Sequence, residues 1–265
     1  MPTRAVPLQD RPASKRRGGK KAARKGSHGI ARSAPGNQRL INHLGRDIPV
    51  RVQRNRQARH MSLRIDAREA CAVLTLPYWV LIAEGMAFAR SKADWVVRQL
   101  DELAPHTPFA DGHTVPYHGR DVLISHFPLA GPDPILSGDV LHVPGSPAAV
   151  SQAVRDWLVE EARRALAVRV AVKAAMIRRD PPPFRLTDPR ARWGSCSSDG
   201  RLCFSWRLIM APIEVLDYVV AHEVAHLQAL DHSPRFHAIV ERLTPHSDFA
   251  RDWLDTEGAR LLRYG

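Results

Sequence analysis

The sequence predicts an α+β fold, with short strands in the first half of the chain and helices in most of the second half. Residues alternate between polar and apolar at 48–66 and 70–77, as they do in half-buried strands. Apolar residues recur every three or four positions at 147–179, as they do in a long amphipathic helix. A chain of 265 residues is long enough to bury a sizeable core between such elements.

The first 39 residues differ from the rest of the chain in charge. They contain eleven Lys or Arg and one acid, Asp10, so they carry +10 of the net charge of +12. They are rich in Pro, Gly and Ser and offer little to bury, so residues 1–39 are predicted to be a disordered basic tail. Such a tail is either a solvated extension or an arm that contacts nucleic acid or a membrane surface non-specifically.

The sequence favours a soluble protein in a reducing compartment such as the cytoplasm. The tail lacks the apolar stretch of a secretory signal, and no window of about 18 apolar residues predicts a membrane span. The three cysteines are too few for a disulfide framework.

Residues 40–145 are predicted to form a β-rich region with one helix. The helix is expected at 79–103 because its apolar residues are spaced by three and four, and two prolines at 104–108 interrupt the pattern. The first two strand segments are expected to form a small antiparallel sheet. No internal repeat is apparent in the sequence. The strands are predicted at 48–66, 70–77, 115–127 and 135–143.

Residues 146–265 are predicted to form a second region, unless 40–265 folds as a single domain. The long helix at 147–179 ends at the proline run 180–183. Further helices are expected to begin at Pro212 and Pro234, because proline is favoured in the first helical turn. An amphipathic stretch from Phe249 to Leu262 closes the chain.

A hairpin is predicted between the long helix and the later helices. Asp199-Gly200 is a strong signal for a two-residue turn, which would join strands at 192–198 and 201–208. In that register Trp193 lies opposite Trp206. One face of the hairpin is then aromatic and is expected to pack into the core.

The same register places Arg192 opposite Arg207 on the other face. Like charges repel across a strand pair, so an anionic group is expected nearby. Either an arginine steadies an oxyanion or a substrate carboxylate or phosphate, or it pairs with an acid. The facing Cys196 and Cys203 are expected to be small packing residues rather than a disulfide. The candidate acids are Asp180, Asp188 and Asp217.

The segment from His222 to His232 has the pattern H-E-x-x-H-x5-H and predicts a catalytic zinc. Residues four apart lie on the same face of a helix, so His222 and His226 can bind one metal ion. Glu223 lies beside that face and is expected to be the general base for a water activated by the metal. A chance H-E-x-x-H has a probability of about 3% if His and Glu are each ~5% of residues. Two buried core histidines are therefore the weaker interpretation.

A catalytic zinc takes three protein ligands and keeps its fourth position open, so one more donor is needed. His232 is the first candidate. It lies too far past His226 to share its helical face, so the helix must end near 229–231 and the chain must fold back. Three later residues are alternatives for the third ligand: His237, Glu241 and His246.

Four blocks of the sequence carry a resemblance to a known family: R-W-G-S-C-S at 192–197, F-S-W-R-L-I at 204–209, L-D-Y-V-V-A-H-E at 216–223 and H-S-P-R-F at 232–236. Together they resemble the YgjP-like metallopeptidases, which are related to the SprT-like and WLM zinc proteases. The resemblance covers most of the chain after the tail. It implies a zincin-like catalytic region within 146–265, with a small antiparallel sheet over the active-site helix. It also implies Zn²⁺ bound by His222, His226 and His232.

The spacing of the three histidines equals that of the metzincins, but two features exclude that group. Ala229 occupies the position of their turning glycine, and no Met follows His232, so a Met-turn is impossible.

These observations predict a zinc-dependent hydrolase that cleaves peptide bonds in a peptide or protein. An extended substrate could add as a strand to the free edge of the hairpin. Two alternatives stay open. The first is a nucleoside-triphosphate pyrophosphatase that uses the same metal, although the sequence has no Gly-rich loop to bind phosphates. The second is a nucleic-acid-associated protein with a structural zinc, although a structural zinc normally has four protein ligands. The candidates for a second group that contacts the substrate are Arg192, Arg207, Tyr218 and His237.

Overall fold

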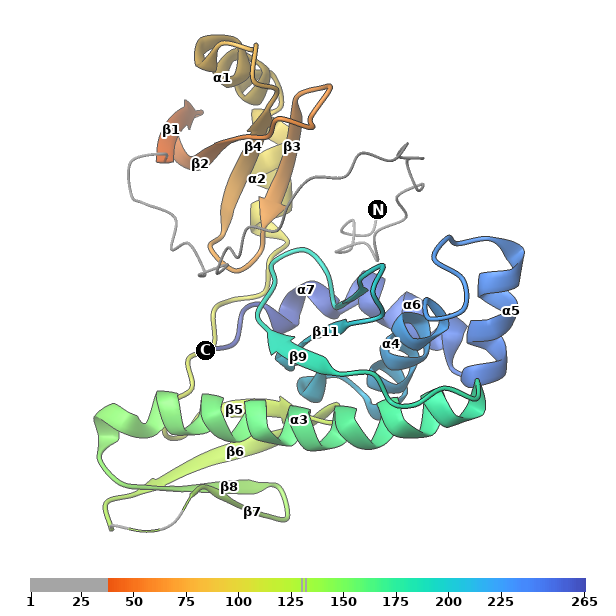
Figure 1. Ribbon diagram of the computed structural model, residues 1–265. Helices are drawn as coiled ribbons and strands as arrows, with labels where there is room; N and C mark the ends of the chain where they lie inside the picture. Colours follow the sequence, from red (N-terminus) through yellow and green to blue (C-terminus); the bar gives the residue numbers. More distant parts are fainter. Residues whose placement is uncertain (1–37, 130, 132) are drawn as a thin grey trace, which may run out of the picture. The chain divides into compact units, whose positions relative to one another are not determined.

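The computed structural model describes residues 38–129, 131 and 133–265, which form two units, 38–103 and 104–265 (Figure 1). The predicted basic tail lies outside the described residues, except for its last two positions, which begin the first strand. The second unit starts at Ala104, whereas the sequence placed the start of the second region at residue 146.

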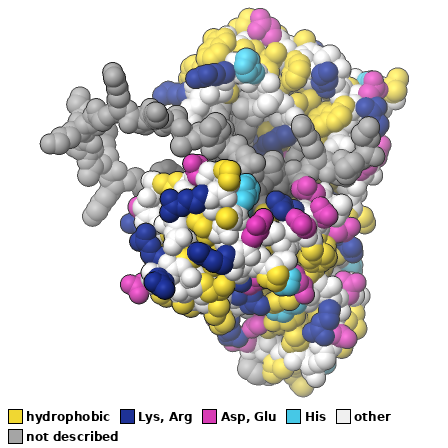
Figure 2. Space-filling model, turned by 90° about the vertical axis from the view of Figure 1, so that its right-hand side faces the viewer, with side chains coloured by type: hydrophobic (Ala, Val, Ile, Leu, Met, Phe, Trp, Pro, Cys, Tyr) yellow, Lys and Arg dark blue, Asp and Glu magenta, His cyan; other side chains and the backbone are white. Residues whose placement is uncertain are grey.

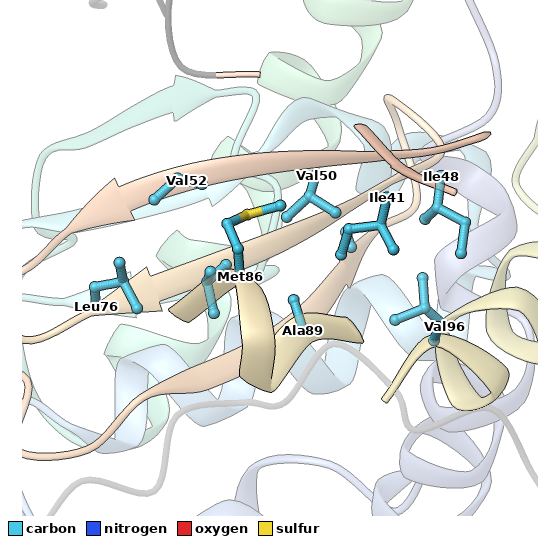
Figure 3. Close-up of a cluster of buried hydrophobic side chains, with 11 residues drawn as sticks. Ile41, Ile48, Val50, Val52, Leu76, Met86, Ala89 and Val96 are labelled. Carbon is cyan, nitrogen blue, oxygen red and sulfur yellow. The ribbon is translucent and has the colours of Figure 1, made fainter. Parts of the chain in front are cut away.

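The N-terminal unit is a four-stranded sheet with two helices on one face. The sheet order is β1-β2-β4-β3. Figure 3 shows the core of this unit, in which Val50 of the sheet lies over Met86 and Ala89 of the first helix, and Ile48 lies over Val96 of the second. The elements are β1 (Gln38–His43), β2 (Arg46–Arg54), β3 (Ser62–Asp66), β4 (Cys71–Leu76), α1 (Ile82–Ser91) and α2 (Ala93–Asp101).

Two predictions for this unit are wrong in detail. The sheet is mixed rather than antiparallel, because β2 and β4 run parallel at its centre. Alternation of polar and apolar residues specifies which side chains face the core, and it does not specify the partner strand. The single helix predicted at 79–103 is two helices, because Lys92 leaves helical geometry at φ −111° and ψ 12°. As a result α1 contacts β4, whereas α2 contacts β1 and β3.

The C-terminal unit begins with a second four-stranded sheet, in which the predicted strands at 115–127 and 135–143 each fold as a hairpin. Its order is β5-β6-β8-β7, and its central pair, β6 and β8, is parallel. This is the topology of the N-terminal sheet, so the two sheets repeat one arrangement although no internal repeat is apparent in the sequence. The strands are β5 (Thr114–Tyr117), β6 (Arg120–Phe127), β7 (Ile135–Ser137) and β8 (Val140–Pro144).

The long helix predicted at 147–179 is α3 (Val150–Met176), preceded by one 3₁₀ turn. Within this unit α3 has the β5–β8 sheet along one side and the later helices along the other (Figure 1). The later helices are α4 (Ile213–Ala225), α5 (Pro234–Leu243), α6 (Ser247–Thr256) and α7 (Gly258–Leu261). These elements confirm the predicted α+β class.

Helix α4 lies at the centre of these helices and contacts α3, α5 and α6. A buried polar cluster fixes it there. Lys173 of α3 donates from Nζ to Asp217 Oδ2 of α4 at 2.8 Å and to the Leu243 carbonyl of α5 at 2.6 Å. Thr244 donates to the same carboxylate at 2.7 Å. Because buried charges are tolerated only when they are paired, these bonds couple the position of α4 to both neighbours.

The predicted hairpin is present, but its register differs by one residue. It consists of β10 (Gly194–Cys196) and β11 (Leu202–Ser205), and β9 (Phe184–Thr187) completes a sheet of order β10-β11-β9. Ser195 lies opposite Cys203, not Phe204. The turn contains three residues rather than two, since Ser197 and Arg201 close it and Gly200 has φ +80°. A type I turn followed by a left-handed glycine produces this offset.

Arg207 does not lie in the hairpin as predicted, because β11 ends at Ser205 and residues 206–210 form a 3₁₀ helix. The guanidinium of Arg207 is fully buried. It donates to Asp188 at 2.7 Å and to the carbonyls of Leu261 and Tyr264 at 2.9 and 2.8 Å. Arg207 thus pairs with one of the predicted acids and ties the hairpin region to the end of the chain, so it is not exposed to a substrate.

Replacing Arg207 with Met is expected to lower the free energy of unfolding by about 3–5 kcal/mol, because Asp188 and two carbonyls lose a buried partner. Urea unfolding of the purified variant would measure this loss. The matched control is Arg163→Met on α3, where the side chain is half exposed and, among the described residues, pairs only with Glu160. The control should change stability by about 0.5 kcal/mol or less. Equal effects of the two substitutions would contradict a structural role for Arg207.

Candidate metal centre

Two of the predicted ligands come from the last turns of α4, whose residues after Ile213 and Glu214 are almost all buried. His222 lies within the helix, and His226 is the residue that ends it. Their rings are 5.1 Å apart between centroids. The four-residue spacing therefore brings both imidazoles to one side of the helix, as the sequence predicts.

The chain turns sharply after His226 and brings back a third histidine. Leu227 and Gln228 donate to carbonyls three residues earlier, at 3.0 Å each, so the last turn is tighter than an α-helix. The helix consequently ends at Ala225, earlier than the 229–231 expected from the sequence. His232 then returns, and its Nε2 lies 3.2 Å from Nε2 of His222.

The three histidines form a set of nitrogen donors that suits one metal ion. One ligand nitrogen from each lies within 4.8 Å of the others. Two nitrogens bound to one tetrahedral zinc at ~2.0–2.1 Å would be roughly 3.3 Å apart, close to the separation between His222 and His232. Among the described residues the predicted rivals His237, Glu241 and His246 are not part of this cluster.

The local environment favours the neutral form of His222 and His226. Burial lowers the pKa of His222 to about 3, and the neighbouring His226 and His232 add to the shift. Burial also lowers the pKa of His226. Because a metal binds the neutral imidazole, neither of these two residues has to lose a proton at neutral pH before it binds an ion.

Contacts behind the donors hold the rings in place. His226 Nδ1 lies 3.0 Å from the Ala229 carbonyl, so the other nitrogen of that ring is free for a metal. Phe236 of α5, fully buried, stacks on His226 at 4.5 Å between ring centroids. Its ring also lies 4.9 Å from His222 and 4.7 Å from His232. Phe236 was missed in the sequence because an apolar residue on an amphipathic helix is read as ordinary core.

Glu223 is buried next to the histidines, under strand β10. Burial raises the pKa of its carboxyl to about 8, and the charge of Arg192 partly opposes that shift. A cation bound by the neighbouring histidines would favour the carboxylate, because it reverses the local electrostatic penalty. Glu223 is therefore a buried carboxyl whose proton is poised to be exchanged near neutral pH.

Gly194 of β10 leaves space for the carboxyl group of Glu223. A Cβ at this position would lie 2.5 Å from Glu223 Oε1 and 2.7 Å from its Cγ. Real Cβ atoms do not approach other atoms so closely, so the strand can pass over the carboxyl only with glycine here. The need for glycine within R-W-G-S-C could not be seen before the contact with Glu223 was known.

The other candidate substrate-binding residues lie in different environments. Arg192 is exposed and acts on the charge of Glu223, so it lies close enough to the site to influence it. Tyr218 is buried, with its ring 6.0 Å from that of His222. His237 is exposed and packs against Phe236. Arg207 cannot contact a substrate, because its side chain is buried beside Asp188.

The cysteines and the surface charges add no second centre. Cys71, Cys196 and Cys203 are all free thiols, and burial together with the charge of Glu223 raises the pKa of Cys196 to about 11. On the face seen in Figure 2, arginine and lysine side chains are interspersed with acidic ones. Among the described residues, no helix is long and apolar enough to span a membrane.

Comparison with known proteins gives one match. The family model of the YgjP-like metallopeptidase domain matches residues 59–257, which is well over half of the chain. No curated protein and no solved structure matches the sequence.

Proposed function

Because the chain belongs to the YgjP-like metallopeptidase family, we propose that it is a zinc-dependent peptidase in which Glu223 is the general base. The observation that supports this most is the convergence of three histidines and one buried carboxyl at the end of α4. Incubation of the zinc-loaded protein with a peptide library, followed by mass spectrometry of the products, would test the activity. No cleavage at any peptide bond would contradict it.

The proposed metal ligands are His222, His226 and His232. A zinc ion held by three imidazoles, with its fourth position open, lowers the pKa of bound water towards ~7 and polarises a carbonyl group. Three protein donors fit such an open site better than a structural zinc, which four protein ligands normally close. The donor set thus favours catalysis over the alternative of a nucleic-acid-associated protein.

Glu223 supplies the proton chemistry in this proposal. Its carboxylate accepts a proton from the attacking water, holds it at Oε, and delivers it to the nitrogen of the leaving amine. Burial under β10 suits both steps, because it raises the pKa of this carboxyl and so opposes the lowering that a bound cation would cause. A buried carboxyl with no such role would be an unexplained cost to folding.

Strand β10 is the proposed guide for the substrate, which gives the site a zincin-like arrangement of edge strand over helix. It lies at one edge of its sheet and contacts α4. The Trp193 carbonyl accepts a hydrogen bond from Ser205 of β11, and the Ser197 N–H donates to Arg201, the residue before β11. The backbone groups of Gly194 and Cys196 therefore point away from β11. An extended peptide can bond to those groups as an added strand and so present its backbone beside Glu223.

Replacing Gly194 with Ala is expected to lower kcat/KM for peptide cleavage at least tenfold, because the added methyl must displace the Glu223 carboxyl or lift β10 from α4. Zinc content should stay at the wild-type level, since the three atoms nearest to the added methyl all belong to Glu223 and none to a histidine of the proposed ligand set. Steady-state kinetics together with metal analysis would measure both quantities. Unchanged kinetics would show that the carboxyl does not act from the position seen here.

A further inference from the structure

A pocket of about 620 Å³ lies on the three-stranded sheet, on the strand that passes over Glu223. Ser195 and Cys196 of β10 line it, and the preceding residue, Gly194, is the one that touches Glu223. The pocket is therefore within one or two residues, along the same strand, of the proposed catalytic base. A substrate bound along β10 can reach it with a neighbouring side chain or with its end.

The charged groups that line this pocket are three arginines and one acid: Arg185, Arg192, Arg201 and Asp199. Their formal sum is +2. Asp199 is engaged with Arg201 at 3.2 Å and with the Ser197 hydroxyl. Within the described part of the chain, neither the side chain of Arg185 nor that of Arg192 makes a hydrogen bond or an ion pair. Two arginines repel one another when they line one pocket without an acid for each of them. A bound anion would relieve that repulsion.

The side chains that line the pocket favour a carboxylate as the bound anion. A guanidinium donates two parallel N–H groups that match the two oxygens of a carboxylate, and the Ser195 hydroxyl can add a single donor. Burial keeps the Cys196 thiol protonated, so it adds no opposing charge. A peptide substrate offers carboxylates from two sources, the side chains of Asp and Glu and its own C-terminus.

We propose that the pocket formed by Arg185, Arg192 and Arg201 is a substrate subsite that binds a carboxylate and gives the enzyme a preference for acidic peptides. As a substrate subsite, it rests on the proposed peptidase function. Arg192 then serves two neighbours, since it also lies near Glu223. Arg185 is the cleaner probe, because only Arg192 influences the charge of that carboxyl.

The test compares pairs of peptides that differ in one charge. One pair carries Glu or Gln at the same position near the cleaved bond, and a second pair ends in a free carboxylate or an amide. Wild-type protein should favour the acidic member of at least one pair about tenfold in kcat/KM at low salt, in line with a charge-assisted hydrogen bond. The pair that shows the preference identifies the source of the carboxylate.

Arg185→Gln should bring that ratio close to one, whereas the control Arg163→Gln on α3, outside the pocket, should keep the wild-type ratio. A ratio of one in wild-type protein, for both peptide pairs, would overturn the subsite while leaving peptide cleavage intact.

Binding measured without cleavage separates the two proposals. Isothermal titration of the same peptide pairs into zinc-loaded Glu223→Gln protein should show the same preference, and its loss with the added Arg185→Gln change. If wild-type protein cleaves nothing but this binding preference is present, the peptidase proposal fails and the carboxylate pocket stands. If neither binding nor cleavage distinguishes the peptides, the pocket proposal is wrong.

Discussion

Replacing Glu223 with Gln is expected to lower kcat/KM for peptide cleavage about a thousandfold, because general acid–base catalysis typically contributes ~10²–10⁴ to the rate. Gln has nearly the same shape as Glu and can still fill the space beneath Gly194. It cannot accept a proton from water or deliver one to the leaving amine. The rate should therefore fall without collapse of the site, and steady-state kinetics with the best library peptide would measure it.

Two controls make this result specific. Zinc content and thermal stability of Glu223→Gln should match or exceed those of wild-type protein, since a buried carboxyl with a raised pKa is replaced by a neutral group. Glu241→Gln on the exposed side of α5 should leave the rate unchanged. If Glu223→Gln retains the wild-type rate, the general base has been misassigned.

Replacing His232 with Ala is expected to lower zinc affinity by about two to three orders of magnitude. Zinc sites of three or four ligands contribute on the order of 10 kcal/mol or more, so one ligand accounts for roughly 3 kcal/mol. His232 is the informative choice because it comes from the turn after α4, and its 3.2 Å approach to His222 is the contact that completes the cluster. Competition with a chromophoric chelator would measure the affinity.

The matched control for this prediction is His237→Ala. His237 was a rival third ligand in the sequence, and it lies on α5 outside the cluster of ligand nitrogens. Its replacement should leave zinc affinity within about threefold of wild type. If His237→Ala loses zinc and His232→Ala retains it, the third ligand is His237 and not His232.

Much of the site could be predicted from the sequence because the relevant residues are close together in it. His222, Glu223 and His226 occupy one helical turn, so their relative positions follow from the geometry of a helix. His232 follows within a single turn and could be placed by requiring a third donor. The helix boundaries around 150–176 also follow from local periodicity, which is the most reliable sequence signal.

Most of the features that could not be predicted depend on residues far apart in the chain. The sequence named three candidate acids for Arg207, and the choice of Asp188 among them depends on how distant segments pack. The one-residue shift of the hairpin is a local exception, because the Asp199-Gly200 signal is compatible with a turn of two or of three residues. The parallel central pairs of both four-stranded sheets cannot be predicted from the alternation of polar and apolar residues, because that alternation does not specify the partner strand. The close approach of Gly194 to Glu223 joins a strand to a helix, and no local pattern records it.

The most direct test of the central claim, that three histidines hold a catalytic zinc, is X-ray absorption spectroscopy of the zinc-loaded full-length protein. The account predicts three imidazole nitrogens at about 2.0–2.1 Å with one further oxygen donor. In His232→Ala the imidazole signal should fall from three to two. A sulfur donor at about 2.3 Å, or four protein ligands that leave no open position, would contradict the account.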